Sequence, residues 1–175
     1  MSEIIRKIKI EDCPSIARVV TLGWNQTYKG IVNEEFLQLL IENEELRSKR
    51  MIGDFETLKD EFFVLEIDNQ VVGFISYTKS EIEGYKDIGE IRAFYIIDGY
   101  KGAGYGKKLL QRAARELMSK GFNEIIIGCL DKNPSNSFYV HMGGKKVGTQ
   151  IITKGNQDLL ENLYHYDNIK DLLNK

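Results

Sequence analysis

The sequence is poor in cysteine, proline and histidine, with two of each among its 175 residues. Cys13 and Cys129 lie far apart and lack the paired spacing of a zinc site or a disulfide framework, so we expect two reduced thiols. His141 and His165 show neither a partner spacing for zinc nor a Ser-His-Asp arrangement, so we expect no metal. Two prolines cannot supply a proline-rich linker.

The chain also lacks a surplus of charge and a long hydrophobic run. Its formal net charge is -2, from 24 basic and 26 acidic residues, which argues against non-specific binding to nucleic acid. No stretch is apolar for the length that a membrane span or a signal peptide needs. We therefore expect a cytoplasmic protein with no nucleic-acid or membrane partner. Its length predicts a single domain over residues 1–175. We expect a monomer or a homodimer.

Periodicity predicts alternating helices and strands with no linker between them. A strand over residues 4–10 precedes a helix that Asp12 caps and that runs to about Tyr28. A second helical region starts at Asn33, and its buried side is predicted to hold Phe36, Leu37, Leu39, Leu40, Leu46 and Met51. The later elements are hairpin strands 62–67 and 71–77, strand 90–97, helix 107–120, strand 124–130, helix 134–142, and strands 145–149 and 159–166. The tail 167–175 shows no clear pattern.

The most informative segment is the glycine-rich loop Lys101-Gly102-Ala103-Gly104-Tyr105-Gly106, which joins the predicted strand 90–97 to the predicted helix 107–120. Glycines at a helix start expose backbone N–H groups, and the helix dipole places its positive end there. Lys107 and Lys108 follow at positions where the dipole disfavours cations. The loop therefore indicates a site for a phosphate or pyrophosphate group.

Spacing excludes two common nucleotide-binding loops. A Walker loop needs a glycine where Lys101 stands and a hydroxyl residue where Lys108 stands. The dinucleotide fingerprint needs a third glycine where Lys107 stands. A glycine-rich turn without a ligand stays open as the alternative.

Two segments together resemble the GNAT superfamily of acyl-CoA-dependent N-acetyltransferases. The loop is similar to the family's pyrophosphate loop, Gln/Arg-x-x-Gly-x-Gly/Ala, with Lys101 in place of the usual first residue. The segment from Asn133 to Gly144 is similar to a family segment that carries an asparagine, a Phe-Tyr pair and a closing glycine. The resemblance is sharp from residue 90 to residue 144. It implies an α/β fold (α+β) with a central mixed and strongly twisted sheet of about six to seven strands, flanked by about four helices, with two central parallel strands splayed to admit CoA.

The resemblance also implies which residues bind acetyl-CoA. The pyrophosphate would be held by Lys101, Gly102, Ala103, Gly104, Tyr105, Gly106 and Lys107. Asn133 and Asn136 would hydrogen-bond the cosubstrate, and Ile96 and Ile97 would offer main-chain groups to its pantetheine arm. An asparagine before proline that serves only as a turn residue is the alternative for Asn133.

The implied chemistry is direct transfer of an acetyl group from a thioester to an amine, which needs a base for the amine and an acid for the departing thiolate. The resemblance assigns the acid to Tyr139, whose hydroxyl is a donor at neutral pH. It assigns the base to Glu90, at the start of the strand before the loop. The alternatives are ordinary aromatic packing of Phe138 with Tyr139 and a surface ion pair between Glu90 and Arg92.

The acceptor is less well defined. Trp24 and Tyr28 fall where relatives build one wall of the amine pocket, and aromatic faces suit cationic amines, although core packing is an equal alternative for Trp24. Relatives that acetylate ribosomal-protein N-termini often carry a glutamate five residues before the asparagine, where this chain has Gly128. We therefore predict a small amine such as a polyamine as the substrate. A catalytically silent CoA-binding or regulatory module and a peptide or protein N-terminal acetyltransferase are the alternatives.

Overall fold

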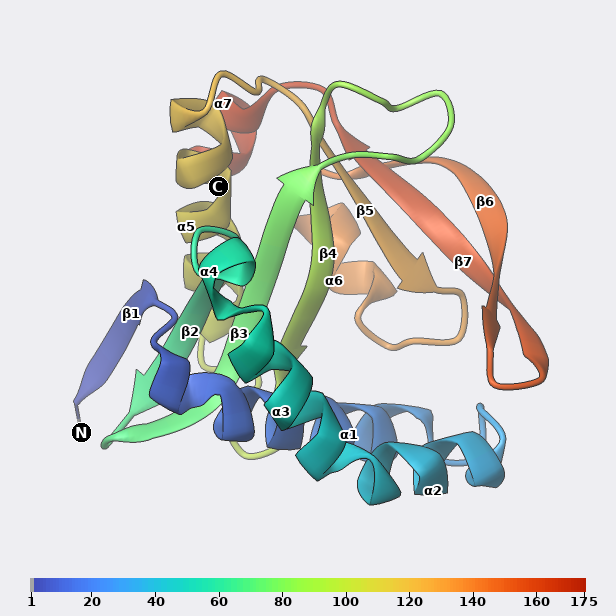
Figure 1. Ribbon diagram of the computed structural model, residues 1–175. Coiled ribbons are helices and arrows are strands. Elements are labelled where there is room, and N and C mark those ends of the chain that lie inside the picture. The colour runs from blue at the N-terminus through green and yellow to red at the C-terminus, as the bar shows by residue number, and fades with distance from the viewer. Residues whose placement is uncertain (1) are drawn as a thin grey trace. The chain divides into compact units, whose positions relative to one another are not determined.

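The computed structural model describes residues 2–175, and its strands form one mixed sheet (Figure 1). The strands are β1 (Glu3–Lys7), β2 (Phe62–Ile67), β3 (Gln70–Lys79), β4 (Gly89–Ile96), β5 (Ile125–Leu130), β6 (Lys145–Lys154) and β7 (Gln157–Tyr166). Their order in the sheet is β1-β2-β3-β4-β5-β7-β6. The seven strands and the mixed sheet confirm the predicted fold class.

The described residues form seven α-helices, where about four were expected. They are α1 (Cys13–Tyr28), α2 (Glu34–Glu42), α3 (Glu44–Gly53), α4 (Phe55–Leu58), α5 (Tyr105–Ser119), α6 (Asn136–His141) and α7 (Ile169–Leu173). The predicted second helical region is divided into three helices, because the backbone leaves the helical conformation at Asn43 and at Asp54. None of these helices is long and apolar enough to cross a membrane.

Contacts divide the chain into two compact units. The first contains the residues up to Ser76 together with Ala93–Leu109, and the second contains Tyr77–Arg92 and Leu110–Lys175. The strands β3 and β4 and the helix α5 therefore each contribute residues to both units. A single domain over residues 1–175 stays a prediction.

In the first unit, β1, β2 and β3 form an antiparallel sheet. The turn between β2 and β3 places Asp68 and Asn69 at positive φ, as a tight hairpin with this right-handed twist requires. β1 ends at Lys7 rather than continuing to Ile10, because a 3-10 turn forms over Ile10–Asp12.

A hydrophobic core joins α1 to this sheet. Its fully buried members are Ile8, Cys13, Ile16, Val19, Val64 and Phe74. Asp12 lies at the N-cap position of α1, but its carboxylate accepts hydrogen bonds from Arg6 and from the Lys9 amide rather than from the first turn of the helix. The predicted cap is therefore right in position and wrong in partner.

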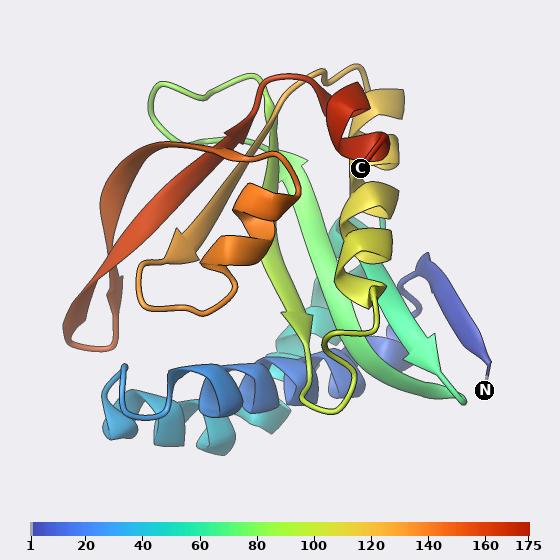
Figure 2. The ribbon, with the colours of Figure 1, turned by 180° about the vertical axis from the view of Figure 1, so that it is seen from behind.

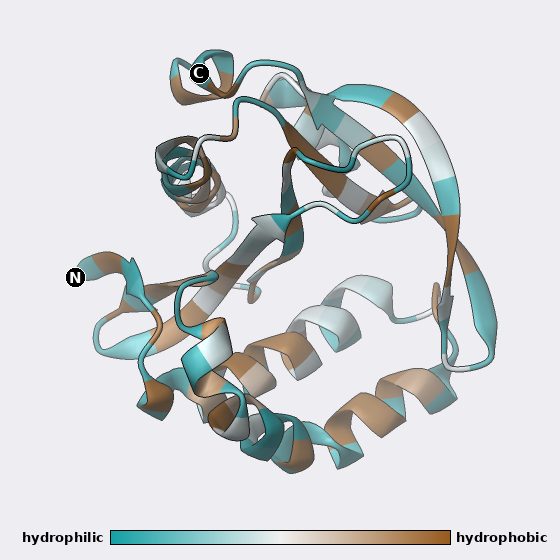
Figure 3. Ribbon diagram, turned by 45° about the horizontal axis from the view of Figure 1, so that its top comes forward, coloured by the Kyte–Doolittle hydropathy of each residue, from teal (hydrophilic) through white to brown (hydrophobic). Residues whose placement is uncertain are grey.

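The helices α2 and α3 are less buried than their sequences predicted. α2 is coloured as hydrophobic over most of its length in Figure 3, yet Leu37 is its one buried residue. Leu39 is 42% exposed and Leu46 in α3 is 44% exposed, so the prediction that both lie on the buried side is wrong. The guanidinium of Arg47 holds the helices together, because it donates to the carbonyl oxygens of Ala17 in α1 and Leu40 in α2.

In the second unit, β4 and β5 run parallel, and β5, β7 and β6 are antiparallel neighbours. The β4–β5 pairing joins Gly89–Ile91 to Ile125–Ile127, and Arg92 and Gly128 lie beyond the paired segment. α7 in the tail was not predicted. Its Asn168 cap accepts a hydrogen bond from the Lys170 amide, and Ile169 and Leu172 are each 1% exposed.

Candidate active site

The glycine-rich loop lies in the first unit, between the end of β4 and the start of α5 (Figure 2). Gly102 and Gly104 have φ values of +79° and +83°, a conformation that side-chain-bearing residues rarely adopt. Nothing lies within 4 Å of the place where a Cβ atom would stand on either glycine. The loop therefore presents exposed backbone to open space at the N-terminal end of α5, as a phosphate-binding turn requires.

The helix after the loop begins at Tyr105, two residues earlier than predicted. The Lys108 amide donates to the Gly104 carbonyl oxygen at 3.2 Å, so Gly104 belongs to the first turn. Tyr105 and Gly106 are half-buried, whereas the flanking Ala103 and Lys107 are exposed. Gly102 and Gly104 have no side chains to cover the loop, so its backbone is available to form the binding surface.

Two cationic side chains near the loop, those of Lys101 and Lys108, have carboxylate partners within the protein. Lys101 Nζ lies 2.7 Å from the Asp98 carboxylate, and both side chains are largely exposed. Lys108 Nζ lies 2.7 and 2.9 Å from the two carboxylate oxygens of Glu3. Exposed pairs of this kind are worth less than about 1 kcal/mol, so a phosphate group can displace the Asp98 carboxylate from Lys101 at little cost.

The main chain at the end of β4 has two different environments. The Ile97 amide donates to the Val72 carbonyl oxygen of β3 at 3.0 Å, and its own carbonyl accepts from the Tyr100 amide at 3.3 Å. Because successive peptide groups of a strand point to opposite edges, the N–H and C=O of Ile96 point away from β3. Of the two predicted pantetheine contacts, Ile96 thus has the more suitable direction.

Trp24 and Tyr28 lie on α1 and are 8% and 5% exposed. Their ring centroids are 4.6 Å apart, and Trp24 also meets the edge of Phe36 from α2 at 5.4 Å. Within the first unit the structure brings these two predicted residues together as a packed aromatic cluster. A role for either ring in amine binding stays a prediction.

In the second unit, Asn133 and Asn136 hold the turn between β5 and α6. Asn136 Nδ2 donates to the carbonyl oxygens of Leu130 and Asn133 at 2.8 and 2.7 Å. Its Oδ1 accepts from Tyr164 Oη at 2.7 Å and from Asn162 Nδ2 at 3.0 Å. Both the Nδ2 and the Oδ1 atoms of the Asn136 side chain are thus held by hydrogen bonds within the protein, and any contact with the cosubstrate stays a prediction.

The side chain of Asn133 makes the local contact expected of a turn residue. Its Oδ1 accepts from the Ser135 amide at 2.8 Å, which is an Asx turn. The turn aligns the chain for α6, which begins at Asn136. This contact agrees with the turn alternative, and a contact between Asn133 and the cosubstrate stays a prediction.

Tyr139 lies on α6 and is 6% exposed. Its ring stacks on Tyr164 of β7 with a centroid distance of 5.7 Å, and its carbonyl oxygen accepts from Tyr166 Oη at 2.9 Å. Gly144 packs closely here, since a Cβ atom would lie 2.9 Å from the Tyr139 carbonyl oxygen. The closing glycine of the segment is therefore needed for packing, and Tyr139 has a fixed orientation.

Glu90 lies on β4 opposite Ile126 of β5, and its side chain is half-buried. Its Oε2 accepts from the Glu81 amide at 3.4 Å. Arg92 is exposed on the same strand. Glu90 and Tyr139 both belong to the second unit, whereas the glycine-rich loop and Trp24 belong to the first.

Sequence reasoning missed the supports of these residues. Asn162 and Tyr164 fix Asn136 from β7, and Tyr166 fixes the backbone of Tyr139. All three alternate along β7 on one face, which is the strand periodicity that could have placed them together. Nothing in the spacing indicated which residues they would meet.

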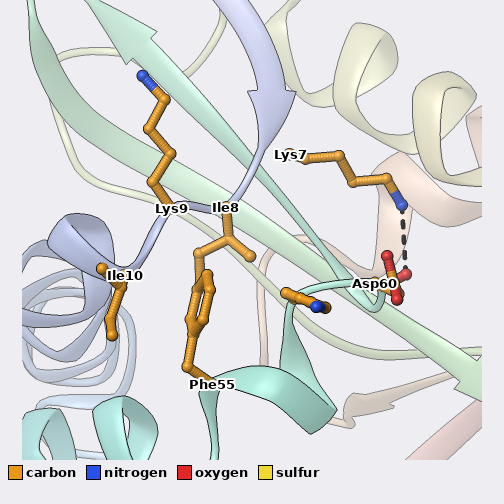
Figure 4. Close-up of a pocket in the computed structure, with 7 residues that line it drawn as sticks. Lys7, Ile8, Lys9, Ile10, Phe55 and Asp60 are labelled. Carbon is orange, nitrogen blue, oxygen red and sulfur yellow. Dashed lines mark hydrogen bonds between the residues drawn. The ribbon is translucent and has the colours of Figure 1, made fainter.

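A separate hollow of about 390 Å³ opens in the first unit (Figure 4). It is lined by Lys7, Ile8, Lys9, Ile10, Phe55, Lys59 and Asp60. Lys7 Nζ donates to the Asp60 carbonyl oxygen at 3.2 Å, and Lys59 pairs with Glu56. The hollow contains none of the predicted site residues.

Comparison with known proteins identifies the class of protein. The model of the acetyltransferase (GNAT) family matches residues 24–143. The uncharacterized N-acetyltransferase YuaI of Bacillus subtilis is 32% identical over 137 residues, which cover 77% of this chain and 76% of that protein. The spermidine N(1)-acetyltransferase of Thermoplasma acidophilum is 26% identical over 168 residues, which cover 94% of this chain and 99% of that protein.

A solved structure shares the fold. The PaiA N-acetyltransferase of Thermoplasma acidophilum, crystallised in complex with coenzyme A, matches with a TM-score of 0.68 and 23% identity over 93% of this chain and 98% of that chain. The mixed sheet with its parallel β4–β5 pair is thus a GNAT fold. The chain belongs to the GNAT acetyltransferase family, and it is an N-acetyltransferase.

Proposed function

We propose that this enzyme transfers the acetyl group of acetyl-CoA directly to a primary amine of a small molecule, with polyamines as the substrate class. The observation that carries the substrate class is the similarity to a spermidine N(1)-acetyltransferase along 94% of this chain and 99% of that protein. Gly128 supports it, because the glutamate that many peptide-acetylating relatives carry at this position is absent.

The first unit supplies the binding loop for the cosubstrate. The amides of Gly102 to Gly106 would hold the pyrophosphate, because they lie in an exposed turn at the positive end of α5 with open space above two of the glycines. Lys101 and Lys107 would add positive charge. Ile96 would offer its main-chain groups to the pantetheine arm. Ile97 would offer only a second acceptor position on its carbonyl oxygen, because its amide donates to Val72 and that oxygen already accepts from Tyr100.

The second unit supplies the proton chemistry. A primary amine attacks a thioester only when it is neutral, so a base must first remove a proton from the ammonium group. Glu90 takes this proton through water in the proposed reaction. The amine nitrogen forms a bond to the acetyl carbon, the bond from that carbon to sulfur breaks, and Tyr139 Oη protonates the departing thiolate. The nitrogen gives up its second proton through water, which restores the Tyr139 hydroxyl and leaves the amide.

Two further parts of the proposal concern the packed residues and the cell compartment. Asn133 and Asn136 would contact the cosubstrate while they hold the turn before α6, and Trp24 and Tyr28 would line the amine pocket.

Both cysteines are free thiols, which supports the expectation of a reducing compartment such as the cytoplasm.

An amine panel tests the proposed function. Release of free thiol from acetyl-CoA is measured with spermidine, single amino acids, an aminoglycoside and an alanyl-starting peptide. We expect kcat/KM for spermidine to exceed that for the peptide by about tenfold or more, which corresponds to about 1.4 kcal/mol of transition-state binding. A tenfold preference for the peptide would refute the polyamine proposal, and binding of acetyl-CoA without turnover of any amine would favour a silent CoA-binding module.

A further inference from the structure

The carboxylate of Glu161 occupies the space over Gly128 in the second unit. A Cβ atom on Gly128 would lie 2.5 Å from Glu161 Cδ and 2.6 and 2.7 Å from the two carboxylate oxygens. Contacts this short do not occur between a real Cβ atom and its neighbours, so no larger residue fits at Gly128 while Glu161 keeps this position. The glycine on β5 therefore makes room for a carboxylate from β7.

Strand register places Glu161 and Glu90 on the same face of the sheet. Residues opposite each other on neighbouring strands share a face, and every second residue of a strand returns to it. Glu90 lies opposite Ile126, and Glu161 lies opposite Leu130. Gly128 lies between these two positions on β5, so one face carries both carboxylates, and the Glu161 carboxylate lies over the glycine between them.

Tyr139 approaches the sheet from the other face. It stacks on Tyr164, which lies opposite Ile127 on β5. Ile127 alternates with Ile126 and Gly128 and thus faces away from the two glutamates. Tyr139 and the two carboxylates therefore lie on opposite faces of the sheet.

Among the described residues, a side chain of β6 donates the hydrogen bond to the Glu161 carboxylate. Gln150 lies opposite it on β6 and donates from Nε2 to Oε2 at 2.6 Å. An ionised carboxylate can accept about four hydrogen bonds, so one bond from Gln150 leaves acceptor positions for a ligand. Burial raises the pKa of Glu161, the Gln150 bond and the Lys154 charge lower it, and the Glu90 charge raises it, with a net rise. A raised pKa disfavours the charged form of Glu161, and a cation that arrives with the substrate would stabilise that charged form.

We propose that Glu161 binds the ammonium group of the acceptor amine, as a specificity-determining residue next to Glu90. The proposal rests on the proposed acetyl transfer to an amine and adds a residue that neither the spacing nor the resemblance indicated. It assigns recognition of a cationic acceptor to β7. Glu90 then removes the proton from an ammonium group that the two carboxylates hold on this face.

The substitution Glu161→Gln tests this role, because it removes the charge and keeps the shape and the acceptor atom for Gln150. We expect KM for spermidine to rise about tenfold to a hundredfold, the effect of losing about 1.4 to 2.7 kcal/mol of ion-pair binding. The affinity for acetyl-CoA by calorimetry and the melting temperature should stay unchanged. Asp158→Asn is the matched control, since it removes an exposed carboxylate of the same strand that bonds to Thr153.

A second variant moves the carboxylate without removing it. Gly128→Ala places a methyl group 2.5 Å from the present position of Glu161 Cδ, so the flexible end of the Glu161 side chain must move away. We expect the same rise in KM for spermidine, with acetyl-CoA affinity unchanged. If Glu161→Gln does not fold, this variant decides the question.

The outcomes separate this inference from the function on which it rests. If folded Glu161→Gln has the same KM for spermidine as the wild type, Glu161 does not bind the ammonium group. The proposed acetyl transfer is unaffected by that result. If the wild type acetylates an alanyl-starting peptide instead of spermidine, the polyamine proposal fails and the same variants are measured with the peptide. If the wild type acetylates no amine, both proposals fall.

Discussion

Replacing Gly104 by valine should block the pyrophosphate site without a steric clash between the new side chain and neighbouring residues. No atom lies within 4 Å of the place where a Cβ atom would stand on Gly104, so a valine side chain would project into the open space above the loop. That space is where the proposed pyrophosphate lies against the backbone amides. The variant therefore places a branched side chain in the position of the ligand.

The expected loss follows from the number of amides affected. A hydrogen bond from a backbone amide to a charged oxygen contributes about 1.5–3 kcal/mol, so losing one weakens binding by roughly tenfold to 150-fold. Gly104 also has a φ of +83°, and a residue with a side chain is strained there by about 1–2 kcal/mol. This strain lowers stability, and it must be separated from the effect on the ligand.

Gly84 supplies the control for backbone strain. It lies between β3 and β4, has the same φ of +83° and likewise has nothing within 4 Å of a Cβ position. Gly84→Val should therefore cost about as much stability as Gly104→Val and leave acetyl-CoA affinity unchanged. Calorimetric titration of both variants with acetyl-CoA, beside thermal melts, separates the two effects. If Gly104→Val binds acetyl-CoA as tightly as Gly84→Val, the loop does not hold the pyrophosphate.

Three further predictions concern the acid, the thiols and stability. Tyr139→Phe should leave acetyl-CoA affinity nearly intact and lower kcat roughly tenfold to a thousandfold in steady-state assays, whereas full turnover would make Tyr139 a packing residue. Burial raises the pKa of Cys129 to about 12, so its thiol stays protonated and is a poor nucleophile. We therefore expect direct transfer, with intersecting lines in initial-rate plots and no labelled acetyl-cysteine. Isolation of such an intermediate would contradict direct transfer. Burial alone would raise the pKa of Asp12, but hydrogen bonds from Arg6 and the Lys9 amide hold that pKa below its usual value near 3.8. The ionised carboxylate therefore stabilises the folded protein above this value. The stabilisation is lost as the pH falls through the lower pKa of the folded state. Asp12→Asn should thus lower the melting temperature at neutral pH, and this effect should shrink as the pH falls below the usual pKa of the carboxyl group. An effect that does not change with pH would show that the carboxylate charge is not the cause.

The sequence predicted the fold well wherever local patterns determine it. The hairpin of β2 and β3 follows from Asp68 and Asn69, which tolerate the positive φ of a tight turn. The amphipathic pattern after the glycine-rich loop predicted α5 to within two residues. The tail was missed because its helix has five residues, and its two buried side chains gain their burial from tertiary packing rather than from a long periodic pattern.

The helix boundaries before β2 were harder to predict for a related reason. Leu39 and Leu46 follow the spacing of a buried face, but the chain ends α2 at Glu42 and starts α3 at Glu44, so the face is not continuous. Arg47 then bridges three helices through backbone carbonyl oxygens and the Thr21 hydroxyl. Glu44 stands three residues before Arg47, so the spacing suggested an ordinary surface ion pair and gave no sign of this role.

The candidate site divides in the same way between local and distant causes. Spacing alone placed Lys101 to Gly106 at a helix start, because a turn and the helix after it are contiguous in the chain. Glu161 lies 33 positions beyond Gly128, and only the antiparallel register of β5 with β7 brings its carboxylate over the glycine. A shift of one residue in that register would turn Glu161 to the other face. The absence of a side chain at Gly128 was visible in the sequence and favoured a small amine, but the residue that fills the space could be found only from the sheet. The Glu161 carboxylate lies over Gly128, so this face carries negative charge despite the glycine. The case for a cationic acceptor therefore rests on Glu161, and the choice between spermidine and a peptide rests on the amine panel.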